Sequence, residues 1–315
     1  MLRQFITFNF SGKALYILFI LCLTRHNNSI HFTKLRTKTE NNYMKTIKHH
    51  LLRMWLCFVI LPILNSCELF EYHPYDTQNF STSEVNAKNI QRITANDNSS
   101  DTLRFAFIGD TQRYYDETED FVKAINKRND IDFVIHGGDI TDFGLSKEYQ
   151  WMYDILKKLK APFVTVIGNH DVIGHGKDIY REFFGEYNFS FISHRTRFIC
   201  LNTNALEFDY STPVPDFDYM LSFVEDSADI DNTVVVMHVP PYDIEFNNNA
   251  VLMFDYIVGN YKNVRFCLHA HNHMLEENDF FNNGIIYYGC DDISGRNYMV
   301  FTVTPDSYTY SVETF

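Results

Sequence analysis

From residue 101 onward, short apolar runs alternate with segments whose apolar residues recur at helical spacing. The runs at 103–108, 132–136 and 162–167 are rich in β-branched and aromatic residues. Each is followed by glycine, which predicts buried strands. Between them, residues 116–128 and 146–160 have the spacing of amphipathic helices. Strands that alternate with helices predict parallel pairing with right-handed crossovers.

The rest of the chain is richer in strand-like runs than in helical ones. Its expected strands are residues 189–192, 197–202, 233–238, 264–269, 284–289, 297–303 and 307–315. A turn at Pro305-Asp306 separates the last two runs, which favours an antiparallel end to the chain. We therefore predict one α/β domain over residues 101–315. It would consist of two packed, mainly β sheets flanked by helices.

The first 66 residues have another pattern, which is typical of a targeting segment. From Met44, three basic residues precede the apolar run Trp55–Leu64, which has the length of a signal-peptide core and is short for a membrane span. We expect translation to start at Met44, with residues 1–43 as an unstructured upstream extension and residues 44–66 as the signal peptide. The alternative is an uncleaved signal anchor.

The apolar run ends in Leu64-Asn65-Ser66-Cys67, which resembles the lipobox of bacterial lipoproteins. Asn65 departs from the small residue that is commoner there. The resemblance implies cleavage before Cys67 and lipidation of its sulfur. It also implies a protein anchored in the bacterial cell envelope, facing the periplasm or the surface. Residues 67–100 are rich in Asn, Ser and Thr, and we predict that they form a tether or a partly ordered edge segment, with one or two helical turns at Asn86–Ile93.

Composition narrows the function classes. Of 315 residues, 45% are hydrophobic and 21% charged, as in globular proteins rather than disordered or multi-spanning ones. Residues 1–66 hold nine Lys/Arg and one acid, whereas the remaining 18 basic and 39 acidic residues give 67–315 a net charge of −21. Such an acidic domain disfavours nucleic acid as a partner. No CxxC pair occurs, and Cys200 and Cys267 lie in strand-like runs, which favours buried free thiols over a disulfide.

Polar residues of the metal-ligand type follow five of the predicted strands. They are Gly109–Gln112, Gly138–Asp142, Gly168–Asp171, Met237-His238 and His269–His273. Because open α/β sheets bind ligands at the carboxyl ends of their strands, we expect these segments to converge. Oxygen and imidazole ligands without thiolate suit Mn, Fe or Zn. Each cluster taken alone is as consistent with a structural role, in helix caps, turns or core hydrogen bonds, as with metal binding.

The order of the five clusters resembles the calcineurin-like metallophosphoesterase superfamily. That family has D-x-H, GDxxD, GNH[DE], a lone His and GHxH, and here the segments read GDTQ, GDITD, GNHD, VMH and AHNH. The resemblance covers residues 103–315. Gln112 replaces the first His, which changes a metal ligand from imidazole nitrogen to amide oxygen. Ala270 replaces the Gly of GHxH, which is a milder departure.

The resemblance implies a site with two divalent metal ions, Mn, Fe or Zn, and a hydroxide that bridges them. Asp139 would bridge the metals. The first metal would also bind Asp110, Gln112 and His273, and the second Asn169, His238 and His271. His170 would donate a proton to the leaving oxygen as the catalytic acid. Asp171 would hold the His170 ring, and Asp142 would support the site.

Other polar residues near these motifs are weaker candidates for a functional role. Arg113 and His175 are candidates for contact with substrate, although a surface position fits Arg113 equally well. His136 reads as a core histidine, and His269 as a residue behind the ligands. The loops expected to line the pocket are residues 171–177, 205–218 and 240–249, and the last two are rich in aromatic and acidic residues.

The leading hypothesis is a lipid-anchored, metal-dependent phosphoesterase. Its acidic rim fits a small phosphoester, and the residues do not separate a phosphomonoester from a phosphodiester. The alternative is a lipid-anchored binding module whose metal site, weakened by Gln112, only recognises phosphorylated or sugar ligands. Turnover of a simple ester with Mn separates the two.

Overall fold

The computed structural model describes residues 47–56, 73–76, 80, 82–97, 101–208, 212–225 and 229–315. The chain divides into two compact units, Met1–Glu71 and Tyr72–Phe315. In the first unit, residues 47–56 form a helix. Among the described residues, no helix has the length and apolar character that a membrane crossing requires. The predictions for residues 1–43, for most of Trp55–Leu64 and for Cys67 lie outside the described residues.

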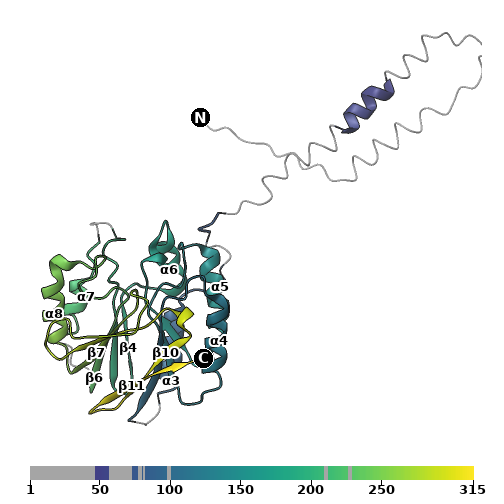
Figure 1. Cartoon of the computed structure of the whole chain (residues 1–315). Coiled ribbons are helices and arrows are strands. Elements are labelled where there is room, and N and C mark those ends of the chain that lie inside the picture. The colour runs from purple at the N-terminus through teal and green to yellow at the C-terminus, as the bar shows by residue number, and fades with distance from the viewer. Residues whose placement is uncertain are drawn as a thin grey trace, which may run out of the picture. The chain divides into compact units, whose positions relative to one another are not determined.

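Two sheets form the core of the second unit, as predicted (Figure 1). The five-stranded sheet has the order β11-β10-β1-β2-β3. Its strands are β1 (Leu103–Ile108), β2 (Phe133–His136), β3 (Phe163–Thr165), β10 (Asn297–Val303) and β11 (Tyr308–Thr314). The pairs β1–β2 and β2–β3 are parallel, whereas β10 and β11 are antiparallel to their neighbours.

The six-stranded sheet has the order β4-β5-β6-β7-β9-β8. Its strands are β4 (Phe189–Ser193), β5 (Thr196–Cys200), β6 (Asn232–Val236), β7 (Val264–His269), β8 (Glu276–Asn278) and β9 (Ile286–Gly289). Strands β5, β6, β7 and β9 run parallel. Phe105 of β1 meets Phe198 of β5 edge to face, with ring centroids 5.3 Å apart, so the sheets pack face to face around aromatic side chains.

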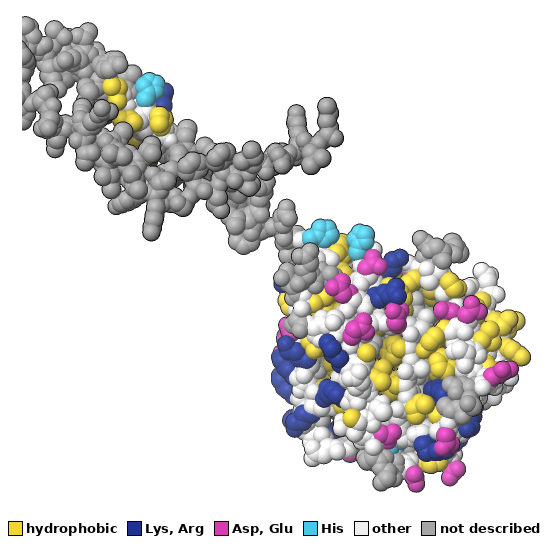
Figure 2. All heavy atoms as spheres, turned by 180° about the vertical axis from the view of Figure 1, so that it is seen from behind, with side chains coloured by type: hydrophobic (Ala, Val, Ile, Leu, Met, Phe, Trp, Pro, Cys, Tyr) yellow, Lys and Arg dark blue, Asp and Glu magenta, His cyan; other side chains and the backbone are white. Residues whose placement is uncertain are grey.

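Helices cover the outer faces of both sheets (Figure 1). On the first sheet lie α4 (Tyr115–Ile125), α5 (Ser146–Leu156) and α6 (Gly176–Phe184), and on the second α7 (Phe217–Leu221) and α8 (Val251–Gly259). Figure 2 shows hydrophobic side chains at the edge where α8 lies. Helix α8 buries Phe254 and Ile257 but leaves Leu252 and Tyr256 72% and 65% exposed. It is therefore apolar on both faces.

Of the two alternatives for residues 67–100, the tether is wrong for the last part of the segment, because α3 (Val85–Ala95) belongs to the folded unit. Val85 and Ile93 are buried in the core. The Asn86 side chain donates to the Thr165 carbonyl at 2.9 Å and accepts from the Thr165 amide at 3.0 Å. These bonds satisfy the free edge of β3. The ordered unit therefore begins before residue 101.

The carboxyl ends of the two sheets meet at small residues. A Cβ at Gly109 would lie 2.6 Å from the Ala270 methyl group, and one at Gly137 would lie 2.9 Å from it. The strand ends after β1, β2 and β7 therefore touch directly, and larger side chains at these glycines would separate them. Cys200, Cys267 and Cys290 are buried free thiols, as predicted for the first two.

Candidate metal centre

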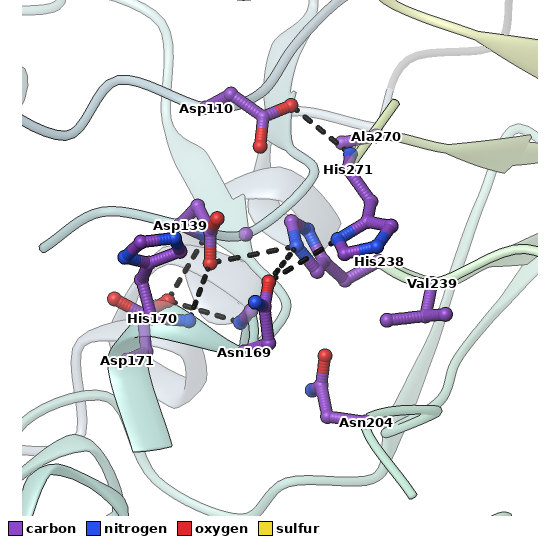
Figure 3. Close-up of polar contacts among 12 residues, drawn as sticks. Asp110, Asp139, Asn169, His170, Asp171, Asn204, His238, Val239, Ala270 and His271 are labelled. Atoms are coloured by element: carbon purple, nitrogen blue, oxygen red, sulfur yellow. Dashed lines mark hydrogen bonds and ion pairs between the residues drawn. The ribbon is translucent and has the colours of Figure 1, made fainter. Parts of the chain in front are cut away.

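The five strand-end segments converge at one end of the two sheets (Figure 3). They follow β1, β2 and β3 of one sheet and β6 and β7 of the other. Four residues of this cluster have left-handed backbone conformations, with φ of 50° at Asp110, 58° at Asp139, 73° at His271 and 53° at His273. Such conformations cost energy in residues other than glycine and concentrate at functional sites.

The first group of candidate ligands contains buried oxygens that accept no hydrogen bond. Ligand atoms of Asp110, Asp139 and His273 all lie within 4.8 Å of one another. Asp110 Oδ1 and Gln112 Oε1 are buried and accept no hydrogen bond. A buried acceptor without a hydrogen bond is costly, and binding to a cation would offset that cost. Asp110, Asp139 and His273 therefore fit a divalent metal, whereas metal binding by the Gln112 oxygen stays a prediction.

The second group gathers around the Asn169 side chain. Its Oδ1 lies 2.9 Å from His238 Nε2 and 3.2 Å from His271 Nδ1. His238 also donates from Nδ1 to the Gly137 carbonyl at 2.8 Å, so both its ring nitrogens donate. Burial opposes a charge on His238, but the adjacent Asp139 carboxylate raises its pKa to about 10. The cluster thus already stabilises positive charge at the place where a metal would sit.

Asp139 lies between the two groups. One carboxylate oxygen, Oδ2, accepts from Gln112 Nε2 at 3.3 Å, and the other, Oδ1, lies 3.4 Å from His238 Nε2. The Asp139 side chain is almost fully buried. Its two oxygens therefore face the two groups of candidate ligands, which is the position that the bridging role requires.

His170 stands at the accessible side of the cluster. Its backbone amide donates to Asp139 Oδ1 at 2.9 Å, and its ring Nδ1 donates to the Asp142 carbonyl at 2.9 Å. The side chain is 33% exposed. A fixed Nδ1–H leaves Nε2 as the free nitrogen of the ring. Asp142 thus supports the site through its backbone, as expected in general terms.

The role predicted for Asp171 is wrong. The Asp171 carboxylate is fully buried and accepts from the backbone amides of Gly168, Asp139 and Thr141 at 2.9–3.0 Å. In the turn η2 (His170–Val172), the two side chains leave the backbone in different directions, so the carboxylate holds this loop rather than the His170 ring. Asp171 ties the segments that carry Asp139 and Asn169 together.

The two candidates for substrate contact lie at different places. The Arg113 guanidinium forms an ion pair with the Asp142 carboxylate, beside the carbonyl that holds His170. Its side chain is 58% exposed. His175 is exposed, and its ring packs edge-on against Tyr75, with centroids 5.1 Å apart. Arg113 therefore stays adjacent to the site, whereas the contact observed for His175 is with Tyr75.

Two of the three loops expected to line the pocket, residues 205–218 and 240–249, approach each other. A cavity of about 380 Å³ lies between them, lined in part by Leu206, Phe208, Glu245 and Phe246. Burial and the nearby Glu207 carboxylate raise the pKa of Glu245. Residues 209–211 of the rim lie outside the described residues. The described part of the rim is both apolar and acidic.

Two carboxylates behind the ligands were missed by sequence reasoning. Asp243 Oδ1 lies 3.4 Å from His271 Nε2, and Asp292 Oδ2 lies 3.5 Å from His273 Nδ1. Asp243 was expected only as one of several rim acids, and Asp292 had no predicted role. Both lie in loops, where the sequence has no periodic pattern that would show which side chains face the site.

His136 is a core histidine, as predicted. It is fully buried, its Nε2 donates to the Thr111 hydroxyl at 2.9 Å, and its Nδ1 accepts from the Gly138 amide at 3.2 Å. His269 is also fully buried and lies behind the ligands, with Nδ1 3.0 Å from the Ala270 carbonyl. Burial lowers the pKa of His136 to about 3 and that of His269 to about 4.

The buried His136 predicts acid sensitivity of the fold. An unfolded chain protonates this ring near pH 6.5, whereas the folded protein does so only near pH 3. Acidification from 6.5 toward 3 therefore lowers the free energy of unfolding by up to about 1.4 kcal/mol per pH unit. In urea unfolding with chelator present, His136→Gln should show a shallower dependence on pH than wild type. Equal slopes for both proteins would contradict the prediction.

Comparison with known proteins locates the family that this site belongs to. The sequence model described as calcineurin-like phosphoesterase matches residues 103–275. This range begins with β1 and contains every candidate ligand from Asp110 to His273. It covers more than half of the chain.

Two curated proteins are similar to this chain over short stretches of sequence, and one solved structure is similar in fold. The uncharacterized protein YvnB of Bacillus subtilis is 33% identical over 101 residues, which are 28% of this chain and 8% of that protein. A probable glycerophosphodiester phosphodiesterase of Arcobacter nitrofigilis is 42% identical over 52 residues, 16% of this chain and 18% of that protein. The structure of GAP50, the anchor in the inner membrane complex of Plasmodium, has a TM-score of 0.53 and 14% identity. The similarity covers 68% of this chain and 84% of that one. It shows a shared fold.

Proposed function

Because the chain belongs to the calcineurin-like phosphoesterase family, we propose that it is a hydrolase that cleaves a small phosphoester with two divalent metal ions. The observation that carries the proposal is the pair of groups of candidate ligands on either side of Asp139, with buried oxygens in the first group that accept no hydrogen bond. When bound, such ions lower the pKa of water and neutralise the charge of a phosphoryl group.

The contacts among the candidate ligands suggest which of them would bind each ion. Asp110, Gln112 and His273 would hold the first, and Asn169, His238 and His271 the second, with Asp139 shared. Mn, Fe and Zn suit these oxygen and nitrogen donors. Two divalent ions carry more positive charge than the Asp110 and Asp139 carboxylates neutralise, so the site would be positive within a strongly acidic domain. A positive site attracts a phosphoryl group, whereas the acidic surface around it repels nucleic acid.

His170 is the residue placed to move a proton. With Nδ1–H held by the Asp142 carbonyl, the ring presents Nε2, and its partial exposure gives that nitrogen access to a substrate. Proton donation to the leaving oxygen would occur from this atom in the imidazolium form of the ring, in which Nδ1 and Nε2 both carry a proton, and would leave the neutral ring with its proton on Nδ1. The Arg113–Asp142 ion pair fixes the loop that supplies the carbonyl. Arg113, which lies in the loop between β1 and α4, would contact the phosphoryl group from beside His170.

The direct test is turnover of p-nitrophenyl phosphate and bis(p-nitrophenyl) phosphate. The name of the Arcobacter relative, a probable phosphodiesterase, makes the diester the first substrate to try. We expect hydrolysis with added Mn²⁺ and its loss after chelation. If neither ester is hydrolysed at saturating Mn²⁺ while the ions bind, the chain is a binding module.

Gln112 should set the metal requirement of the first site. An amide oxygen binds transition metals more weakly than imidazole, so activity should depend on added Mn²⁺. Gln112→His should lower the Mn²⁺ concentration for half-maximal rate, and Gln112→Ala should raise it. A Mn²⁺ titration of the three proteins measures this order. Identical curves would show that Gln112 does not touch a metal.

We propose a cell-envelope location from the sequence of residues 44–67. A mature chain that begins at lipidated Cys67 would be tethered to the membrane and would face the periplasm or the surface. Mass spectrometry of membrane fractions should find acyl chains on Cys67. An unmodified soluble protein that retains the segment would contradict this.

A further inference from the structure

Each candidate histidine ligand turns one ring nitrogen to the cluster and the other to an acceptor behind it. His238 Nδ1 donates to the Gly137 carbonyl at 2.8 Å. His271 has Nδ1 on Asn169 and Nε2 3.4 Å from Asp243. His273 has Nε2 3.4 Å from Asp110 and Nδ1 3.5 Å from Asp292. Two of the three acceptors are therefore carboxylates from otherwise unrelated loops.

A neutral imidazole carries one proton, and a metal can bind only the nitrogen without it. An acceptor behind the ring keeps the proton on its own side and orients the lone pair toward the metal. We propose that Asp243 and Asp292 are positioning residues. Asp243 would set the affinity of the second metal through His271, and Asp292 that of the first through His273. This inference rests on the division of ligands in the proposed function.

Asp243 is held by its own loop, so its carboxylate is aimed rather than free. Its Oδ1 accepts from the Glu245 amide at 2.8 Å, and its carbonyl accepts from the Phe246 amide at 3.2 Å and the Asn248 side chain at 2.6 Å. The carboxylate is 22% exposed. The same loop exposes Ile244 by 87%. The turn thus presents a carboxylate to His271 on one side and an apolar side chain to solvent on the other.

Asp292 is anchored to the strand end that carries Asp110. Its Oδ1 accepts from the Ser294 amide at 2.8 Å and caps the turn η4 (Ile293–Gly295), which leaves Oδ2 for His273. Asp292 bridges to Gly109, and the Ile293 amide donates to the Asp110 carbonyl at 3.4 Å. The residue that orients His273 is therefore fixed to the backbone of another ligand of the same metal.

The test compares Asp243→Asn with Asp292→Asn, which serve as controls for each other. Asparagine keeps the shape and can accept the same amide hydrogen bonds, but it removes the charge. Purified full-length chains are titrated with Mn²⁺, and the bound ion is measured. Asp110→Ala and Asn169→Ala identify which dissociation constant belongs to which site. We expect Asp243→Asn to weaken the second site about 10–100-fold and to spare the first, and Asp292→Asn to do the reverse.

A spectroscopic measurement shows whether Asp243 and Asp292 set the protonation of the histidine rings or only support the loops. In Zn²⁺-loaded protein labelled with ¹⁵N-histidine, long-range ¹H–¹⁵N NMR should show His271 protonated at Nε2 and His273 at Nδ1. The signal of His271 should shift in Asp243→Asn, and that of His273 in Asp292→Asn. Equal weakening of both sites by either variant would overturn the proposal. So would unchanged constants, or the opposite tautomers.

These readings are independent of catalysis. If wild type binds two ions and hydrolyses no ester, the proposed function fails while the roles of Asp243 and Asp292 are still decided by the constants. If wild type hydrolyses esters and both variants bind Mn²⁺ as it does, the roles fail while the function stands.

Discussion

Replacing His170 by alanine is expected to lower kcat about 10²–10⁴-fold on esters with poor leaving groups and to leave the metal content unchanged. His170 contributes only its backbone amide to Asp139, and alanine retains that amide. The lost group is the ring, whose Nδ1 is held by Asp142 and whose Nε2 is free. A poor leaving group needs a proton in the transition state, whereas p-nitrophenolate hardly does. The loss should therefore be much smaller on p-nitrophenyl esters than on alkyl esters.

The comparison of leaving groups is the control within this experiment. His73→Ala, which alters an exposed histidine that packs near Tyr75, should leave both rates as in wild type. Equal losses on both kinds of ester in His170→Ala would indicate that the ring positions the substrate and does not donate a proton.

Replacing Asp139 by alanine is expected to remove both metals and to reduce turnover to background. Its oxygens face Gln112 on one side and His238 on the other, so it contacts a candidate ligand of each ion. Without it, each ion would lose a charged ligand. Metal analysis of the purified variant measures the effect.

Asp110→Ala is the matched comparison, because Asp110 is proposed to bind the first ion only, and its one contact with the second group is with the His271 backbone amide. It should mainly empty one site. If Asp139→Ala retained about two ions per chain, the shared position of Asp139 would be wrong.

The convergence of the candidate ligands could be predicted because these residues follow strands that the sequence marks clearly. Apolar runs that stop at glycine placed Asp110, Asp139 and Asn169 at the end of one sheet, and parallel pairing brings such ends together. His238 and His271 follow the same rule in the second sheet. The two-sheet arrangement followed from the order of the same runs.

Other features lack a local pattern. Helix α3 has polar residues, Asn86 and Asn89, on its buried face, because Asn86 pairs with the edge of β3. Helix α8 is apolar on both faces, so its sequence has no amphipathic period. Adjacent residues in a tight turn can point in different directions, and this is why Asp171 was assigned to His170 although it binds backbone amides.

The most direct test of the account combines metal binding with turnover in the same samples. Chelator-treated protein receives Mn²⁺ stepwise, and bound Mn²⁺ and the rate of bis(p-nitrophenyl) phosphate hydrolysis are measured at each step. If both ions are needed, the rate is proportional to the fraction of chains that hold two ions. It should therefore rise more steeply than the bound Mn²⁺ and reach its plateau at two ions per chain. A plateau at one ion per chain, or full activity before any metal is added, would contradict the account.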